Sequence, residues 1–221
     1  MKKKLTVVYT GVGLICLLCL VLSIVLVRGS LDELGLSTMF PSATPSADPE
    51  KVILYKQPKN PTEIQEGFYD ELIEVTQGYP EVDPYVASEK LAKCFISDFY
   101  TWTNKDGNFD VGGLDYLYGP HHLTFGLYAR DTYYQNFNHF ESEYGVENLM
   151  EVESVTLMNS AYEGQVNIDE EKMESYYLEL EWTYKPGSSM DTSKLQHKAG
   201  ITVIDNKISG RYEIIRIMNI E

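Results

Sequence analysis

Hydrophobic and polar positions follow two different periods along the chain after residue 61. Between Thr62 and Tyr144 the apolar residues recur at helical spacing, and from about Met150 onward they alternate with polar residues. Apolar positions three or four residues apart share one face of a helix, whereas alternation is typical of a half-buried strand. The order of the two patterns predicts helices first and strands afterwards.

Two helix starts are marked by capping residues. Thr62 and Gln65 have the spacing of a capping box, in which each side chain bonds the backbone of the other residue. Asp83 and Pro84 are typical of an N-cap and the first helical position. The second helix is expected to run to about Thr103, where a polar Gly-containing turn follows.

The next part of the chain predicts further helix. A helical turn is expected over Leu114–Tyr118, and a long helical stretch is expected from Pro120 to Tyr144. Glycine lowers helix stability, so a break is expected near Gly126.

Four segments predict strands. The clearest is 176–184, where Tyr, Leu and Trp alternate with Glu and Thr; the others are 199–205, 211–220 and, with a weaker pattern, 150–158. Helices followed by a meander of strands predict an α+β domain, with the helices packed on one face of an antiparallel sheet.

The amino-terminal part of the chain predicts a membrane anchor. Residues 5–27 carry no charge, and 23 helical residues span about 34 Å, which is enough to cross a bilayer core of about 30 Å. The competing interpretation, a cleaved signal peptide, needs a shorter apolar region and small residues at the cleavage site. The three lysines in the cytoplasmic stub, residues 1–4, place the rest of the chain outside the cell membrane.

The anchor is followed by a predicted linker and one domain. Residues 28–61 contain five prolines with Ser and Thr between them, a composition typical of a linker. Residues 62–221 remain, which is enough chain for one globular α+β domain. Its single cysteine, Cys94, excludes an internal disulfide, and homo-oligomerisation is left open.

Charge narrows the classes of partner. All 33 acidic residues but only 14 of the 18 basic residues follow Arg28, so that part of the chain carries a formal charge of −19. Nucleic acid and anionic lipid both require basic patches, which excludes them as expected partners. The charge favours solubility, basic partners or cations.

Two opposite charges fall on predicted apolar helix faces. Asp98 lies within the stripe formed by Leu91, Cys94, Phe95, Phe99 and Trp102. Arg130 lies within a second stripe formed by Leu123, Leu127, Tyr133, Tyr134 and Phe137. Buried charges are normally paired, so a structural Asp98–Arg130 ion pair is the leading interpretation.

A binding site is the sharper hypothesis for the same residues. In that hypothesis Asp98 and Arg130, together with Trp102, Tyr133 and Tyr134, bind a polar ligand at the mouth of a tyrosine-rich cavity. A third interpretation makes Asp98 a general base, although the sequence supplies no matching acid or oxyanion donor.

No cofactor or metal is expected. His121 and His122 are adjacent, so they point about 100° apart on a helix, and helical zinc ligands prefer a spacing of four. The alternating oxygen-bearing side chains of 104–110 lack the Gly and Glu that a calcium loop requires. No phosphate-binding loop or nucleophile elbow occurs, so an enzyme is the less favoured interpretation.

The run Phe95–Trp102, the pair Ala129 and Arg130 with Tyr133 and Tyr134, and the closing strands resemble the nuclear-transport-factor-2-like fold. This fold is a curved sheet wrapped around helices to make a cone. The anchor and this fold together also resemble the bitopic inner-membrane subunits of type IV secretion and conjugation machines. The resemblance implies an assembly scaffold with an empty or plugged cone.

These features predict a single-pass membrane protein with an extracytoplasmic interaction module. Its expected partners are other envelope or membrane proteins, and it is expected to be a scaffold rather than an enzyme. The alternative hypothesis is a small-ligand-binding or lyase-like cone that uses Asp98 and Arg130.

Overall fold

Helices come first and strands second in the described part of the chain, as the periodicity predicted. The computed structural model describes residues 54–168, 170–187 and 189–220. The predicted stub, the predicted anchor and most of the predicted linker lie outside these residues. Among the helices that are described, none has both the length and the hydropathy needed to cross a membrane.

The first two helices begin where the capping residues predicted. Helix α2 spans Glu63–Thr76, and the Thr62 N–H donates to the Gln65 side-chain oxygen at 2.8 Å, as in the predicted capping box. Helix α3 spans Pro84–Phe99, and the Asp83 side chain accepts a hydrogen bond from the Tyr85 backbone at 2.9 Å. These local bonds satisfy backbone N–H groups that have no partner within a helix.

Helix α3 ends earlier than the predicted Thr103. The backbone leaves the helix after Phe99, and the Trp102 N–H donates to the Met150 carbonyl oxygen at 2.8 Å. A partner distant in sequence therefore replaces the next helical hydrogen bond, which periodicity within the helix does not reveal.

The predicted long helix is two helices, α4 (His122–Asp131) and α5 (Phe137–Tyr144). The predicted break at Gly126 is wrong, because Gly126 lies inside α4. The chain instead bends through 132–136, where the fully buried Tyr134 donates from its hydroxyl to the Phe99 carbonyl oxygen at 2.6 Å. Anchoring Tyr134 in the core interrupts the helix at this place.

Short 3-10 turns connect the longer elements. They are η2 (Leu114–Tyr116), η3 (Gly119–His121), η4 (Val146–Asn148) and η5 (Thr192–Lys194). The first of them confirms the helical turn that was predicted before residue 118.

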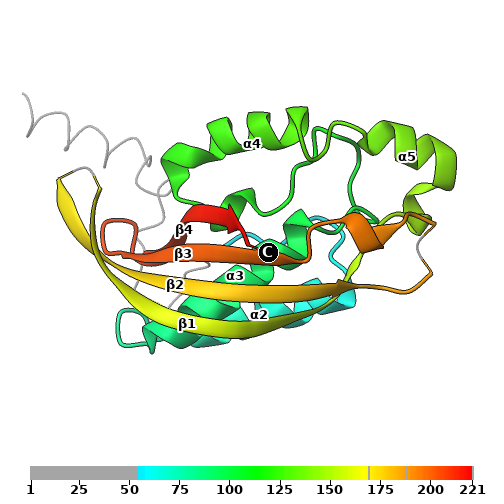
Figure 1. The fold of residues 1–221 in the computed structure, drawn as a ribbon. Coiled ribbons are helices and arrows are strands. Elements are labelled where there is room, and N and C mark those ends of the chain that lie inside the picture. Colours follow the sequence, from blue (N-terminus) through cyan, green and yellow to red (C-terminus); the bar gives the residue numbers. More distant parts are fainter. Residues whose placement is uncertain (1–53, 169, 188, 221) are drawn as a thin grey trace, which may run out of the picture. The chain divides into compact units, whose positions relative to one another are not determined.

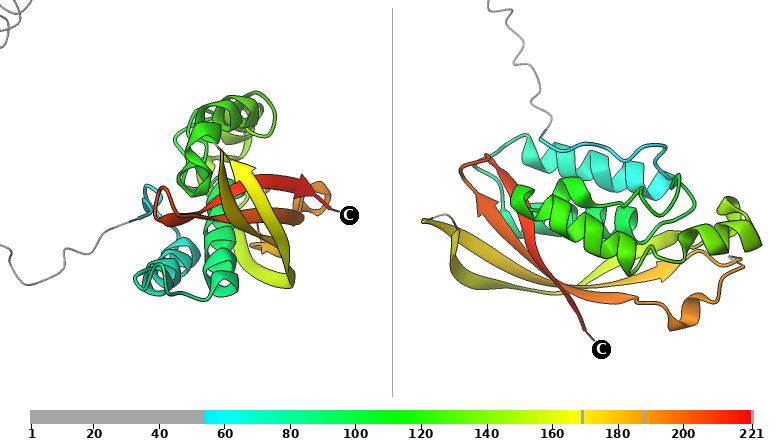
Figure 2. Two further views of the ribbon diagram at one scale, coloured as in Figure 1. Left: turned by 90° about the vertical axis from the view of Figure 1, so that its left-hand side faces the viewer. Right: turned by 90° about the horizontal axis from the view of Figure 1, so that it is seen from above.

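Four antiparallel strands form a sheet in the order β1-β2-β3-β4. The strands are β1 (Val152–Ile168), β2 (Glu171–Tyr184), β3 (Lys198–Asn206) and β4 (Arg211–Asn219). β1 is much longer than the predicted 150–158. Register shifts along the β1–β2 pair mark irregularities of the kind that bend a strand, and Figures 1 and 2 show a strongly curved and twisted sheet.

The helices lie on one side of this sheet, which confirms the α+β class. The right-hand view of Figure 2 shows them above the curved strands. Helix α3 contacts all four strands, and α2 packs on α3. The predicted alternation in β2 is also confirmed, since Tyr176, Leu178, Leu180 and Trp182 are buried.

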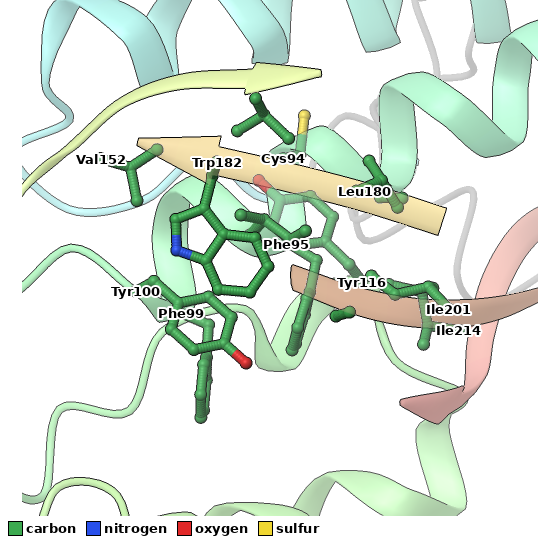
Figure 3. Packing of buried hydrophobic residues seen from close by; sticks show 14 of the residues in the cluster. Cys94, Phe95, Phe99, Tyr100, Tyr116, Val152, Leu180, Trp182, Ile201 and Ile214 are labelled. Carbon is green, nitrogen blue, oxygen red and sulfur yellow. The ribbon is translucent and has the colours of Figure 1, made fainter. Parts of the chain in front are cut away.

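The core forms where α3 meets the middle of the sheet. Phe95 and Cys94 from α3 lie beside Leu180 and Trp182 of β2, and Tyr100 stacks obliquely on Trp182 with ring centroids 4.3 Å apart (Figure 3). Burial raises the pKa of the Cys94 thiol well above its usual range. The thiol therefore acts as a small apolar side chain.

Residues before Thr62 also pack into the domain. Tyr55 is 2% exposed, and its hydroxyl bonds both backbone groups of Tyr212, donating to the carbonyl oxygen and accepting from the N–H at 3.0 Å each. Tyr212 lies in the edge strand β4, so these bonds satisfy two backbone groups on the open side of the sheet. The last residues of the predicted linker 28–61 thus belong to the domain.

We predict that Tyr55→Phe destabilises the domain by about 1–3 kcal/mol, because it leaves two buried backbone groups without a partner. Urea unfolding of the full chain in mild detergent, followed by tryptophan fluorescence, measures the change. Tyr128→Phe is the control, since Tyr128 is 69% exposed. Equal unfolding midpoints for the two variants would contradict this role of Tyr55.

Candidate functional site

Asp98 is a buried carboxylate at the carboxyl-terminal end of α3. It is 8% exposed, and its Oδ1 pairs with the Lys105 ammonium group, which is 6% exposed. Its Oδ2 accepts a hydrogen bond from the Gly113 N–H at 2.6 Å. Both carboxylate oxygens therefore have a partner, as a buried charge requires.

The predicted Asp98–Arg130 ion pair is wrong. Arg130 bonds its neighbour Asp131 at 2.8 Å, and its side chain is 42% exposed. The prediction assumed one continuous helix from residue 123 to residue 137. Helix α4 ends at Asp131, so residues before and after the bend do not share one face. Within α4, Leu123 and Leu127 point into solvent and Ala129 is buried.

Two glycines allow the loop after α3 to reach Asp98. A Cβ atom on Gly112 would lie 2.3 Å from the Asp98 carbonyl oxygen, and one on Gly113 would lie 2.7 Å from the Phe95 ring. Gly113 also has a φ of +78°, which favours glycine. The loop therefore requires both glycines to place its N–H against the carboxylate.

A polar cavity of about 310 Å³ opens beside this ion pair. Its charged lining residues are Lys56, Lys59, Asp98, Lys105, Asp110 and Asp115. The three lysines and three aspartates balance in charge, and the two buried members, Asp98 and Lys105, form an ion pair. The geometry indicates that Asp98 has a structural role rather than a role as a free general base.

A second cavity, which we call the α4 cavity, lies between α4 and the end of β4. It has a volume of about 300 Å³. Its lining is mostly aromatic and comprises Phe95, Phe99, Tyr100, Phe125, Tyr128, Ala129, Thr132, Tyr133, Gln196, Ile217 and Asn219. On its α4 side, the Phe125 ring centroid lies 6.1 Å from that of Phe95 and 5.5 Å from that of Phe99, both in α3.

A third cavity, which we call the α5 cavity, lies between α5 and the loop before β3. It has a volume of about 470 Å³. Its lining comprises Trp102, Thr132, Tyr133, Asn136, Phe140, Tyr144, Met150, Met190, Asp191 and Leu195. Thr132 and Tyr133 border both this cavity and the α4 cavity, so the bend between the helices separates the two.

Tyr133 forms the wall between these cavities. Its ring stacks on Phe99 with centroids 5.1 Å apart, and its hydroxyl lies 3.5 Å from the Met150 sulfur. Burial, with a smaller contribution from the neighbouring Tyr184, raises the pKa of the Tyr133 phenol well above its usual range. The phenol is therefore neutral at physiological pH and acts as a hydrogen-bond donor.

The structure does not bring the five predicted site residues together. Trp102 and Tyr133 line the α5 cavity, Asp98 lines the polar cavity, and Arg130 borders neither of them. Tyr134 is fully buried, and its hydroxyl accepts from the Gly112 N–H at 3.2 Å. The predicted site therefore divides into a structural polar cluster and an aromatic cavity.

Sequence reasoning missed much of the α5 cavity. Phe140 and Tyr144 are four residues apart on one helix face, and this aromatic pair was a usable signal. Met190 and Asp191 come from an irregular segment, so no periodic pattern marks them. Their place beside Trp102 depends on how the chain returns from β2 to β3.

No metal site is evident within the described residues, because nowhere do three or more His, Cys, Asp or Glu side chains converge. His122 lies 2.9 Å from the Leu117 carbonyl oxygen through its Nε2, and His139 lies 3.4 Å from Glu143. These contacts account for two of the four histidines.

Comparison with known proteins adds no relative: no family model matches the chain, and no curated protein or solved structure is significantly similar to it.

We predict that Asp98→Asn destabilises the domain by about 3–5 kcal/mol, because Lys105 is left buried and unpaired. Urea unfolding of the full chain measures the loss. Arg130→Gln is the matched control and is expected to change stability by no more than about 0.5 kcal/mol, as is usual for an exposed side chain.

The double variant Asp98→Asn/Lys105→Met separates pairing from packing. Removing both charges is expected to recover part of the lost stability. A double variant as unstable as the sum of its single variants would show that the two groups do not act as a pair.

Proposed function

We propose that this chain is a membrane-anchored, extracytoplasmic interaction module that docks a cell-envelope protein on α4. The observation that carries the proposal is the apolar outer surface of this helix. Leu123 is 74% exposed, Tyr128 is 69% exposed and Leu127 is 44% exposed. An exposed group of large apolar side chains on one helix is typical of a protein-binding surface.

The spacing of these side chains suits a partner in one orientation. Leu123 and Leu127 are four residues apart and therefore share a face of α4, whereas the exposed Tyr128 lies at the rim of the α4 cavity. The opposite face is occupied, because Phe125 packs on Phe99 with ring centroids 5.5 Å apart. The domain thus holds α4 in place and leaves its leucines available.

Charge favours a protein partner over a lipid surface. The chain after Arg28 carries a formal charge of −19. Anionic headgroups would repel it, so the leucines would have to overcome that repulsion to enter a bilayer. A protein partner with an apolar groove and a basic rim would bind the leucines and also complement the negative charge.

The uncharged segment 5–27, preceded by three lysines, supports an anchor with the domain outside the cell membrane. The curved sheet around α3 and the cavities beneath α4 and α5 support a cone of the nuclear-transport-factor-2-like type. We include this cone in the proposal, together with a role as a non-enzymatic scaffold in an envelope assembly such as a secretion or conjugation machine.

Site-specific photocrosslinking in intact cells tests the docking surface. A photoreactive residue at Arg130, which lies on the leucine face three residues after Leu127 and whose side chain is 42% exposed, is expected to capture the same identified envelope or membrane protein in repeated experiments. The same residue at Ile208 is the control, since Ile208 is 67% exposed in the turn between β3 and β4.

The variant Leu123→Ser/Leu127→Ser tests whether the captured protein binds α4. It is expected to abolish capture while changing stability by only about 0.5 kcal/mol, because both side chains are exposed. Capture of the same proteins from positions 130 and 208, or capture that survives the double substitution, would overturn the proposal.

A further inference from the structure

The α5 cavity has the size and lining of a small-molecule site. Its volume of about 470 Å³ falls within the range of about 300–1,000 Å³ that is usual for ligand pockets. Most of its lining side chains are aromatic, Met or Leu, with a few polar groups among them. This site is separate from the leucines of α4, so it goes beyond the proposed docking function.

Aromatic rings from three parts of the chain form its walls. Trp102 follows α3, Tyr133 lies in the bend before α5, and Phe140 and Tyr144 lie on α5 itself. The Trp102 ring centroid is 5.6 Å from that of Tyr133 and 6.4 Å from that of Phe140. The Phe140 and Tyr144 rings are nearly parallel, with centroids 6.2 Å apart. The four rings are therefore neighbours around one space.

Among the described residues that line the cavity, Asp191 is the only one with a charge. Its Oδ1 accepts from the Ser193 N–H at 3.1 Å and from the Ser193 hydroxyl at 2.5 Å, and its side chain is 64% exposed. These bonds hold the carboxylate at the rim. Lys194 approaches its other oxygen only to 3.9 Å and is 85% exposed, so it competes weakly for the charge.

We propose that the α5 cavity binds an organic cation of the quaternary ammonium class. The faces of aromatic rings attract cations, and a carboxylate at the rim adds a complementary charge. The acidic domain also raises the local concentration of cations. These three features favour a positive ligand over an anionic one.

The polar lining decides between kinds of cation. A primary ammonium has three N–H donors and a guanidinium has five, and each donor that is buried needs an acceptor. Apart from Asp191, the side-chain acceptors at the cavity are Thr132, Asn136 and the phenol oxygens. A fully methylated ammonium has no N–H donor, so it loses no hydrogen bond on entering.

Calorimetric titration of the purified full chain with choline tests the proposal. The matched control ligand is the neutral isostere of choline, in which carbon replaces the nitrogen. Choline is expected to bind, and the isostere is expected to bind at least about tenfold more weakly, because it lacks the charge that the rings attract. Equal affinities, or binding of neither ligand, would overturn the proposal.

Variants at the rim connect binding to this cavity. Phe140→Leu and Tyr144→Leu are each expected to weaken choline binding about three- to thirtyfold, the range of one cation–π contact. Asp191→Asn is expected to weaken it as well, whereas Lys194→Gln is expected to strengthen it by removing the competing ammonium. Trp102 is 3% exposed and part of the core, so it is left unchanged.

Two controls keep the result specific. Phe109→Leu removes an aromatic ring that is 71% exposed and outside the cavity, and it is expected to bind choline normally. Leu123→Ser/Leu127→Ser removes the α4 surface and is also expected to bind normally, so failure of the docking proposal leaves this one intact. Choline binding that is unchanged in all the rim variants would place the site elsewhere and overturn the assignment.

Discussion

The packing of α3 across all four strands is the interaction on which the rest of the domain depends. The helix contributes Phe95 and Phe99 to the core, and β2 contributes Leu180 and Trp182 to the same cluster. Each of these side chains removes a large apolar surface from water, which is the dominant stabilising term in a domain of this size. The sheet curves around α3. The shorter helices α4 and α5 do not fill all the remaining space, which leaves the α4 and α5 cavities.

The end of α3 also determines the electrostatics of the core. Asp98 lies on the buried face of the helix, so the chain must supply a cation and an N–H within reach of it. Lys105 and Gly113 do so from one loop, and the lack of a Cβ atom at Gly112 and Gly113 permits the approach. The charge that the sequence predicted for binding or catalysis is thus paired within the domain, and the aromatic cavities are left as the candidate sites.

The bend between α4 and α5 separates the two proposed sites, the leucine surface of α4 and the α5 cavity. The bend allows α4 to pack its Phe125 and Ala129 inward while its leucines stay outside. It also orients α5 so that Phe140 and Tyr144 face the loop that carries Asp191. A protein partner on one surface and a small cation in the other cavity would therefore act on neighbouring parts of the same segment.

The sequence by itself determined the features that depend on neighbours along the chain. The caps at Thr62 and Asp83, the buried stripe of α3 around Asp98, the alternation in β2 and the α+β order all follow from local hydrogen bonding and periodicity. The net negative charge and the uncharged amino-terminal segment could also be stated from the sequence. The tertiary structure alone decided that α3 ends at Phe99, that the helix breaks at Thr132 rather than Gly126, and that Asp98 pairs with Lys105. The physical reason is that each outcome depends on a partner outside the helical pattern around it. Met150 ends α3, the Phe99 carbonyl oxygen anchors Tyr134 at the bend, and the loop after α3 supplies Lys105 and Gly113 to Asp98.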